Sequence, residues 1–197
     1  MKIGVLALQG NFAEHIVTLA RIGVQGCEVR LPRQLDDLDG LIIPGGESTT
    51  IGKLAVDFGL VEPLRAFGQH KAIWGTCAGA IFLSRDTVGR KQPVLELMDI
   101  QIERNAFGRQ IASFEIDLDI PAIVPPGEPA APYHAIFIRA PLIASAGEGL
   151  EIISRLPDGR IVAARQGRLL ATSFHPELTL DDRFHRYFVH LIQTSAL

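Results

Sequence analysis

The chain has 197 residues, of which 47% are hydrophobic and 21% are charged, and its formal net charge is −3. This composition excludes a disordered chain, a membrane span of ~18–20 apolar residues and a framework of disulfides, because the chain has only two cysteines. No basic block stands out, so nucleic acid and anionic membranes are poor candidate partners. The N-terminal residues lack the features of a secretory signal. We therefore predict one cytoplasmic domain that comprises residues 1–197.

The first half of the chain is predicted to alternate strands and helices. Apolar runs predict buried strands at residues 2–8, 41–43 and 72–75, and a strand-like segment covers residues 27–31. Apolar residues at helical spacing predict helices after Asn11, at about 51–58 and over 61–70. Asn11 and Glu14 form the pattern of a capping box. The alternation predicts an α/β fold with a doubly wound, mostly parallel sheet flanked by helices, which binds ligands at the carboxyl ends of its strands.

The second half is predicted to add antiparallel strands to this sheet. Strand patterns cover residues 98–120 and 133–174, with hairpin turns at 157–159 and 166–167. We interpret the proline-rich stretch 121–132 as a stiff surface loop rather than a domain linker, because apolar strands resume on both sides of it. A final amphipathic helix follows a capping-box pattern formed by Thr179 and Asp182.

The most informative segment places a cysteine between a strand and a helix. The run Gly75-Thr76-Cys77-Ala78-Gly79 has the glycine spacing of a nucleophile elbow, with Cys in place of the usual Ser. The N-terminus of the following helix favours a thiolate, and the Ala78 N–H is placed to bind an oxyanion. We predict that Cys77 is a nucleophile and that Cys27, which no helix follows directly, is a core residue.

A cysteine nucleophile needs a base, and the sequence offers six histidines. His175 differs from the others because it directly follows a predicted strand, and Pro176 favours an extended backbone at this position. Residues i and i+2 of an extended segment project to the same side, so Glu177 is predicted to reach the His175 ring. His15 shows no feature that assigns it to a site, and His185 is predicted to be solvated.

These segments resemble those of the class I, triad-type glutamine amidotransferases, and more narrowly those of the glutaminase subunits of pyridoxal 5′-phosphate synthases. The broader resemblance rests on the elbow, on residues 173–177 and on the glycine-rich turn 44–48. The narrower resemblance rests on residues 6–10, 44–50, 103–110, 137–141 and 173–178. It implies the flavodoxin-like fold of this family.

The resemblance implies hydrolysis of L-glutamine to L-glutamate and ammonia. Cys77 would form the thioester, His175 would move protons and Glu177 would orient His175. The backbone N–H groups of Gly46 and Ala78 would form the oxyanion hole. The glutamine would be held by Gly46, Glu47, Ser48, Arg104, Ile138 and Arg139. No cofactor and no metal are implied.

The resemblance also implies a protein partner. This is a (β/α)8-barrel synthase subunit that receives the ammonia and makes pyridoxal 5′-phosphate, so a hetero-oligomer is expected. Such glutaminases are expected to be weakly active until docked, and the turn 44–48 is the element expected to reorient. The chain departs from the family at Trp74 and in the length of the loop 121–132. Neither is a motif residue, so we expect altered surface contacts and unaltered catalysis.

Two other interpretations stay open. The first is an elbow-cysteine α/β protein of the peptidase-like or stress-response type. The paired Gly-Gly-Glu-Ser and His-Pro-Glu segments argue against it. The second is a non-catalytic regulator of the same fold, and the joint presence of Cys77, His175 and Glu177 argues against it.

Overall fold

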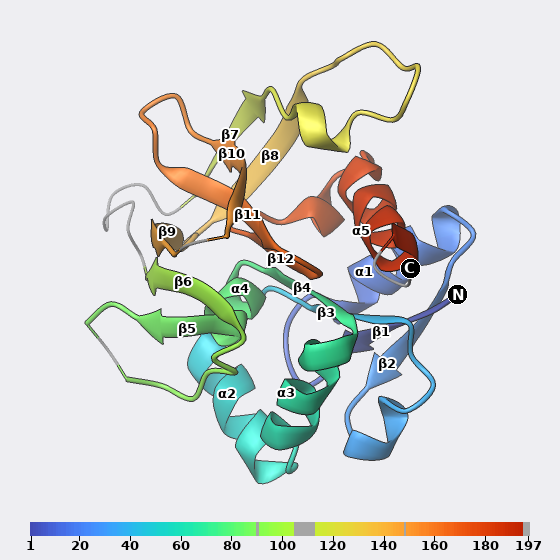
Figure 1. Cartoon of the computed structure of the whole chain (residues 1–197), viewed down its shortest axis with the longest axis vertical. Helices are drawn as coiled ribbons and strands as arrows, with labels where there is room; N and C mark the ends of the chain where they lie inside the picture. Colours follow the sequence, from blue (N-terminus) through green and yellow to red (C-terminus); the bar gives the residue numbers. More distant parts are fainter. Residues whose placement is uncertain (90, 105–112, 148, 195–197) are drawn as a thin grey trace.

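The computed structural model describes residues 1–89, 91–104, 113–147 and 149–194. Five parallel strands form one side of its main sheet: β1 (Lys2–Leu6), β2 (Gln25–Val29), β3 (Gly40–Ile43), β4 (Ala72–Thr76) and β12 (Leu169–Thr172). The sheet continues through β5 (Ser84–Thr87), β6 (Met98–Glu103), β9 (Leu142–Ala146), β10 (Glu151–Arg155) and β11 (Ile161–Gln166). Within the described residues the order is β2-β1-β3-β4-β12-β11-β9-β6-β5, with β10 paired to β11 (Figure 1).

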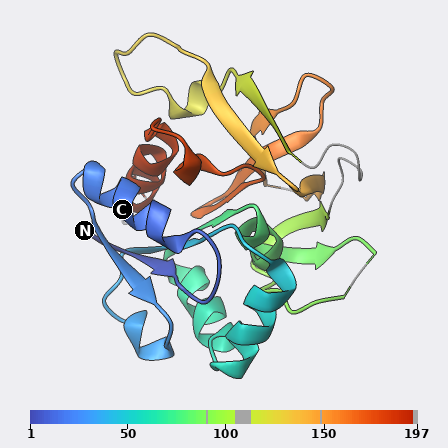
Figure 2. The ribbon, with the colours of Figure 1, turned by 180° about the vertical axis from the view of Figure 1, so that it is seen from behind.

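Helices cover both faces of the parallel strands (Figures 1 and 2). One face packs against α1 (Phe12–Arg21) and α5 (Arg183–Thr194), and the other against α2 (Ser48–Asp57), α3 (Val61–His70) and α4 (Ala78–Leu83). Neighbouring strand residues alternate between the two cores: Trp74 packs on the side of α1 and α5, and Ile73 on the side of α2 and α3. Strands buried on both faces explain the continuous apolar runs of the sequence. The predicted α/β class is confirmed.

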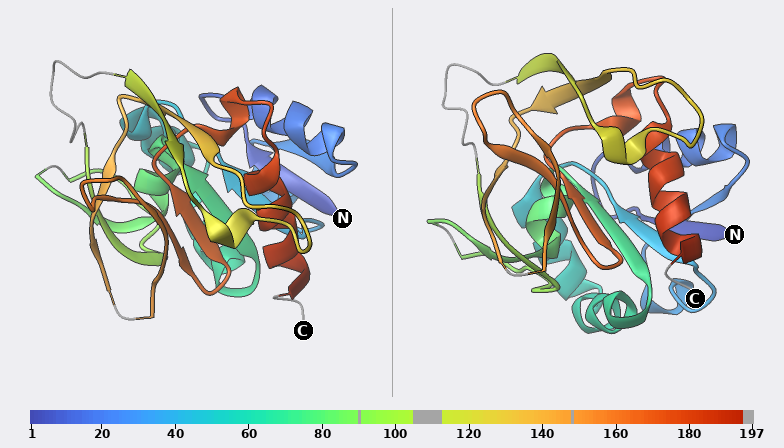
Figure 3. Two further views of the ribbon diagram at one scale, coloured as in Figure 1. Left: turned by 90° about the horizontal axis from the view of Figure 1, so that it is seen from above. Right: turned by 45° about the horizontal axis from the view of Figure 1, so that its top comes forward.

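A separate antiparallel hairpin of β7 (Ser113–Leu118) and β8 (Tyr133–Ile138) lies beside the main sheet. The proline-rich stretch connects its two strands and contains a 3-10 turn, η2 (Pro121–Ile123). Ile123 is buried in the core of α5, and the Arg183 guanidinium of α5 donates to the carbonyls of Ala131 (2.6 Å) and Pro132 (2.8 Å). Figure 3 shows this loop, in yellow, extending toward α5. It is therefore a surface loop fastened to a helix, as predicted.

Both predicted capping boxes are wrong, although the helices themselves form. Asn11 flanks α1 but makes no capping hydrogen bond, because its side chain is turned toward Glu177. Thr179 lies well before α5, which begins at Arg183, and its hydroxyl accepts from the N–H of Asp181 (3.2 Å). The predicted hairpin turns at 157–159 and 166–167 are confirmed. Among the described residues, none of the helices has the length and apolar character to cross a membrane.

Candidate active site

Cys77 sits on a sharp turn at the carboxyl end of β4. Its backbone has φ 47° and ψ −106°, a strained conformation for any residue but glycine, and α4 begins directly after it. Its N–H donates to the Thr172 carbonyl at the end of the neighbouring strand β12 (2.8 Å). A Cβ at Gly79 would overlap the Ile43 carbonyl of β3, so the turn requires glycine there. The predicted strand–cysteine–helix turn is confirmed, and the role of Cys77 as nucleophile stays a prediction.

His175 follows β12, and because β12 is the parallel neighbour of β4, the histidine lies at the same edge of the sheet as Cys77. The His175 Nδ1 atom is 2.7 Å from the Glu177 Oε1 atom. The predicted contact is confirmed, but the predicted extended backbone is wrong. Residues Pro176–Leu178 form a 3-10 turn, η3, and the Glu177 side chain reaches the ring from this turn.

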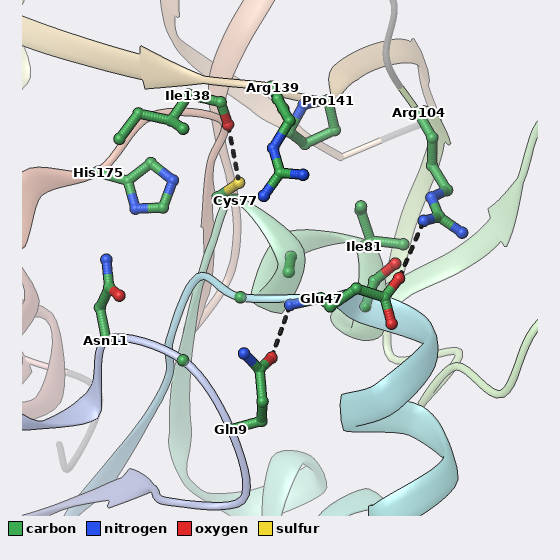
Figure 4. Close-up of a pocket in the computed structure, with 14 residues that line it drawn as sticks. Gln9, Asn11, Glu47, Cys77, Ile81, Arg104, Ile138, Arg139, Pro141 and His175 are labelled. Atoms are coloured by element: carbon green, nitrogen blue, oxygen red, sulfur yellow. Dashed lines mark hydrogen bonds and ion pairs between the residues drawn. The ribbon is translucent and has the colours of Figure 1, made fainter. Parts of the chain in front are cut away.

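Gly45 shows how close the two catalytic candidates lie. A Cβ at this position would be 2.9 Å from His175 Nδ1 and 3.3 Å from Cys77 Cβ. The Cys77 thiol donates a weak hydrogen bond to the Ile138 carbonyl, with 3.9 Å between sulfur and oxygen (Figure 4). The absence of a side chain at residue 45 therefore leaves room for the imidazole beside the cysteine.

The electrostatics favour a charged His175. Burial lowers the pKa of His175, but hydrogen bonds with Cys77 and Glu177 and the charges of these groups outweigh it and raise the pKa to about 10. Burial raises the pKa of Glu177. The neighbouring His15 and the hydrogen bond from His175 lower it by more, so the net shift of this pKa is downward. This arrangement supports a protonated His175 imidazolium beside Cys77 and Glu177.

A cavity of about 360 Å³ opens in front of Cys77 (Figure 4). Its volume lies within the ~300–1,000 Å³ of ordinary small-molecule sites. It is lined by Gln9, Gly10, Asn11, Gly46, Glu47, Ser48, Cys77, Ala78, Ile81, Arg104, Ile138, Arg139, Pro141 and His175. Every residue predicted to bind substrate therefore lies at this cavity, together with both predicted oxyanion-hole residues. Glu177 is buried behind His175 and does not line it.

Opposite charges lie at one end of the cavity. Glu47 caps α2 by accepting hydrogen bonds from Thr49 and Thr50, which together outweigh the opposing effect of burial and lower its pKa to about 2. The Arg104 Nη2 atom lies 3.2 Å from Glu47 Oε1, and Arg104 Nη1 donates to Gln92 (2.8 Å). The glycine-rich turn thus presents a carboxylate that the guanidinium already pairs.

Arg139 is a second strained residue of the site. It follows Ile138 at the end of β8, and its φ is 45°. Figure 4 shows its guanidinium directed into the cavity, on the other side of Cys77 from His175. Strained backbone of this kind concentrates at functional sites. Because Ile138 ends β8 and Arg139 directly follows it, the hairpin β7–β8 supplies one wall of the cavity.

Sequence reasoning missed the residues that surround Glu177. Asn11 Nδ2 donates to Glu177 Oε1 (3.1 Å), and His15 Nε2 lies 3.4 Å from Glu177 Oε2. His185, predicted to be solvated, is fully buried because it faces Trp74 rather than solvent. The available signal was the spacing of Asn11 and His15, since residues i and i+4 share one face of a helix.

Two further predictions have mixed outcomes. Cys27 is half-buried in β2 and packs at the margin of the core, where burial raises the pKa of its thiol. Of the segment 103–110, only Glu103 and Arg104 are described, and residues 105–110 lie outside the described residues. Within those residues no group of three or more His, Cys, Asp or Glu side chains is arranged to hold a metal ion.

The fold and the site define an α/β protein with a Cys-His-Glu constellation at the carboxyl edge of a doubly wound sheet. Residues 5–194 match the SNO glutamine amidotransferase family, and the chain belongs to this family. The resemblance drawn from the motifs is thereby confirmed. Membership argues against the peptidase-like and stress-response alternative.

Curated relatives match the chain over nearly its whole length. The pyridoxal 5′-phosphate synthase subunit PdxT of Pelotomaculum thermopropionicum is 57% identical over 96% of this chain and 94% of that protein. The PdxT subunit of Herpetosiphon aurantiacus is 57% identical over 97% of this chain and all of that protein.

Solved structures agree with the fold. A crystal structure of a glutamine amidotransferase matches with a TM-score of 0.90 and 48% identity, over 97% of this chain and 98% of that one. The structure of PurLQS from Thermotoga maritima matches with a TM-score of 0.71 and 16% identity, over all of this chain and 98% of the matched chain. The second match supports the fold alone.

Proposed function

We propose that the chain is the glutaminase subunit of a pyridoxal 5′-phosphate synthase and hydrolyses L-glutamine to L-glutamate and ammonia. One observation carries the proposal: Cys77 and the His175–Glu177 pair meet at a cavity whose lining also holds a carboxylate and two guanidinium groups. A free amino acid needs such a lining, because it carries both an ammonium and a carboxylate. The names of the PdxT relatives support the assignment to vitamin B6 biosynthesis.

In the proposed reaction the Cys77 thiolate attacks the side-chain amide carbon of glutamine. The tetrahedral intermediate collapses to a γ-glutamyl thioester as the amide nitrogen takes a proton from His175 and leaves as ammonia. His175 then takes a proton from water, which attacks the thioester. Glutamate leaves, and the thiolate is restored with a protonated His175 beside it. Glu177 keeps the imidazole oriented in both steps.

The remaining predicted residues bind charge in this scheme. The N–H groups of Gly46 and Ala78 would receive the oxyanion of each tetrahedral intermediate. Arg104 and Arg139 would bind the α-carboxylate, while Glu47 and the Ile138 carbonyl would bind the α-ammonium. Gly46 and Ser48 would contact the substrate from the glycine-rich turn.

We further propose that residues 1–197 act as one glutaminase domain in the cytoplasm and deliver ammonia to a barrel synthase subunit in a hetero-oligomer. The full-length match to PdxT relatives supports this, because those proteins are named as subunits. Direct transfer between proteins would protect ammonia from protonation in bulk water.

The test is the release of glutamate from glutamine by the purified chain, with and without a synthase barrel subunit. We expect weak release alone and clear stimulation by the partner. In the complex, Cys77→Ala is expected to reduce the rate by about 10³-fold or more, because members of one triad act as a unit. Absence of glutamate release in both settings would overturn the proposal.

A further inference from the structure

We propose that His15 and His185 form a neutral, buried hydrogen-bonded relay that positions Glu177, and through it His175. The inference rests on the proposed glutaminase function. Neither histidine lines the substrate cavity, so both are positioning residues. The relay joins two helices of one face, α1 and α5, to the turn that carries Glu177.

The contacts form a continuous line behind the catalytic pair. His185 Nε2 lies 3.0 Å from His15 Nδ1, and His15 Nε2 lies 3.4 Å from Glu177 Oε2. Both histidine side chains are fully buried. Trp74 closes the site, with its ring edge-on to both histidines at centroid distances of 5.7 Å and 5.0 Å. Two polar rings inside an aromatic core require a reason beyond packing.

The two oxygens of Glu177 receive different neighbours. Oε1 accepts hydrogen bonds from His175 Nδ1 (2.7 Å) and Asn11 Nδ2 (3.1 Å). Oε2 is buried, and no described atom meets it with ordinary hydrogen-bond geometry. The His15 Nε2 atom, at 3.4 Å, is placed to supply the missing donor, and catalytic hydrogen bonds often tighten only when substrate is bound.

This geometry selects one arrangement of protons. If His15 carries its proton on Nε2, it donates to Glu177, and His185 Nε2–H donates to the free His15 Nδ1. Of the ring nitrogens in the relay, His185 Nδ1 then has no described partner and would bear a lone pair. The Thr76 hydroxyl also lies 3.4 Å from His15 Nε2, and it suits either tautomer because it can donate or accept. The opposite tautomers would still aim a lone pair of His15 at the Glu177 carboxylate and bury an unpaired N–H at His185, which is the less favourable arrangement.

The relay must also be uncharged. Burial lowers the pKa of His15 and of His185, and the surrounding charges do not reverse either shift. The groups that face His15 are Glu177, His175, His185 and Glu14, and those that face His185 are His15 and Arg21. A neutral donor fixes the carboxylate without compensating its charge, so the full negative charge of Glu177 acts on His175.

Glutaminase kinetics in the reconstituted complex test the relay through matched substitutions. His15→Leu removes the donor, whereas His15→Gln retains an N–H near the position of Nε2. We expect His15→Leu to lower kcat at least tenfold with KM changed less than threefold, and His15→Gln to recover most of the loss. The control is His190→Leu, an exposed residue of α5, which should match the wild type. Equal kcat for His15→Leu and the wild type would overturn the proposal.

Two measurements on the isolated chain do not depend on turnover. In a Cys27→Ser background, the pH profile of Cys77 alkylation by iodoacetamide should have a higher midpoint in His15→Leu than in the parent. In ¹⁵N-histidine spectra of the wild-type chain, His15 should be neutral and protonated on Nε2 from pH 6 to 8. Superimposable alkylation profiles, or a charged or Nδ1-protonated His15, would overturn the relay.

The outcomes separate the two proposals. A wild-type complex that releases no glutamate, but whose chain shows the expected tautomer and alkylation shift, refutes the glutaminase function and leaves the relay standing. Normal glutamate release by a wild-type complex whose His15 is charged or protonated on Nδ1 supports the glutaminase function and refutes the relay. Because the spectra use the unmodified chain, misfolding of a variant cannot decide the result.

Discussion

Two residues of the site, Cys77 and Arg139, hold backbone conformations that glycine adopts more readily. Their φ values are 47° and 45°. Each such residue costs about 1–3 kcal/mol, and it keeps this conformation only where the surrounding structure enforces it. At Cys77 the enforcement comes from the hydrogen bond to Thr172 and from the start of α4. The strained backbone lets β4 turn directly into α4 at Cys77, and this tight turn presents the sulfur at the cavity.

A pair of substitutions at Cys77 measures this strain. Both Cys77→Ala and Cys77→Gly remove the thiol, but only glycine relieves the positive φ. Glycine relieves the strain of the positive φ, but it also has the greater entropy in the unfolded chain, which favours unfolding. We expect the first effect to exceed the second, so that the free energy of unfolding of the glycine variant is higher by about 1 kcal/mol. Urea unfolding of the two variants checks the order. An alanine variant as stable as the glycine variant would mean that the turn stores no strain.

The contact between Asn11 and Glu177 gives a second prediction at this scale. Hydrogen bonds to charged groups are worth about 1.5–3 kcal/mol, so Asn11→Ala should lower kcat of the complex about tenfold or more. Asn11→Asp should be worse, because it places a second carboxylate against Glu177 at the same distance. The measurement is kcat and KM for glutamine. An aspartate variant with wild-type kcat would show that Asn11 does not support Glu177.

At the scale of elements, α1 and α5 meet through two buried histidines. Their position makes the packing of both helices sensitive to protonation, because a charged imidazole in this core would be desolvated. The same face holds Trp74 and Phe184, which pack against each other at 6.1 Å between ring centroids. The imidazole rings of His15 and His185 therefore lie among the aromatic side chains that join α1 and α5 to the sheet.

Stability should therefore fall in mild acid. Burial lowers the pKa of His15 and His185 in the folded state, so below the unfolded value of ~6.5 the unfolded chain binds protons that the folded chain cannot. The free energy of unfolding should decrease from pH 7.5 to pH 5.5. His175 opposes this decrease between pH 7.5 and ~6.5, because its pKa of about 10 lets the folded chain hold a proton that the unfolded chain has largely released. Below ~6.5 it is protonated in both states and adds little slope, so there the two buried histidines act alone. Its stabilising contribution is lost progressively as the pH rises from ~6.5 to about 10.

The comparison that tests this is thermal unfolding of the wild type and of His185→Gln at both pH values. The variant cannot be protonated at residue 185, so its Tm should fall less on acidification. His190→Leu serves as the control, since residue 190 is exposed and lies on the same helix. Equal pH dependence in all three proteins would assign the acid sensitivity to other groups.

The elements themselves were largely predictable from sequence, and their detailed ends were not. Continuous apolar runs identified the parallel strands, because burial on both faces removes the polar alternation. Asn11 matched a capping pattern, but its side chain donates to the carboxylate of Glu177, which is distant in sequence, and does not cap α1. His185 was predicted to be solvated because it lies outside the apolar stripe of α5. In the structure it is buried, because its ring packs edge-on against Trp74 beside that stripe.

At the scale of the molecule, the site exists because parallel strands end at one edge of the sheet. The segments after β1, β3, β4 and β12 supply Gln9, the turn 44–48, Cys77 and His175 respectively. The pairing of β4 with β12 brings together residues nearly half the chain apart. Sequence indicated both strand ends, but not that these strands are neighbours, since the order of strands in a sheet is not written in local patterns.

Binding of glutamine to the whole molecule should be visible as stabilisation. In the Cys77→Ala chain, a ligand at 100 times its Kd adds about 2.7 kcal/mol, which corresponds to a rise in Tm of roughly 5–10 °C for a chain of this size. Adding Arg139→Ala should reduce the rise, because it removes one predicted carboxylate partner. Differential scanning fluorimetry with glutamine and with D-glutamine measures the effect. Equal shifts for both enantiomers would contradict a specific site.

The ion pair between Arg104 and Glu47 has a consequence for the ionic strength of the medium. This end of the cavity is already balanced in charge, because the guanidinium and the carboxylate lie 3.2 Å apart. A bound zwitterionic amino acid would break this ion pair. Its carboxylate would then pair with Arg104 and its ammonium with Glu47, so one ion pair is replaced by two. Such an isocoulombic exchange leaves the net charge of the cavity unchanged, so added salt should alter the affinity for glutamine little.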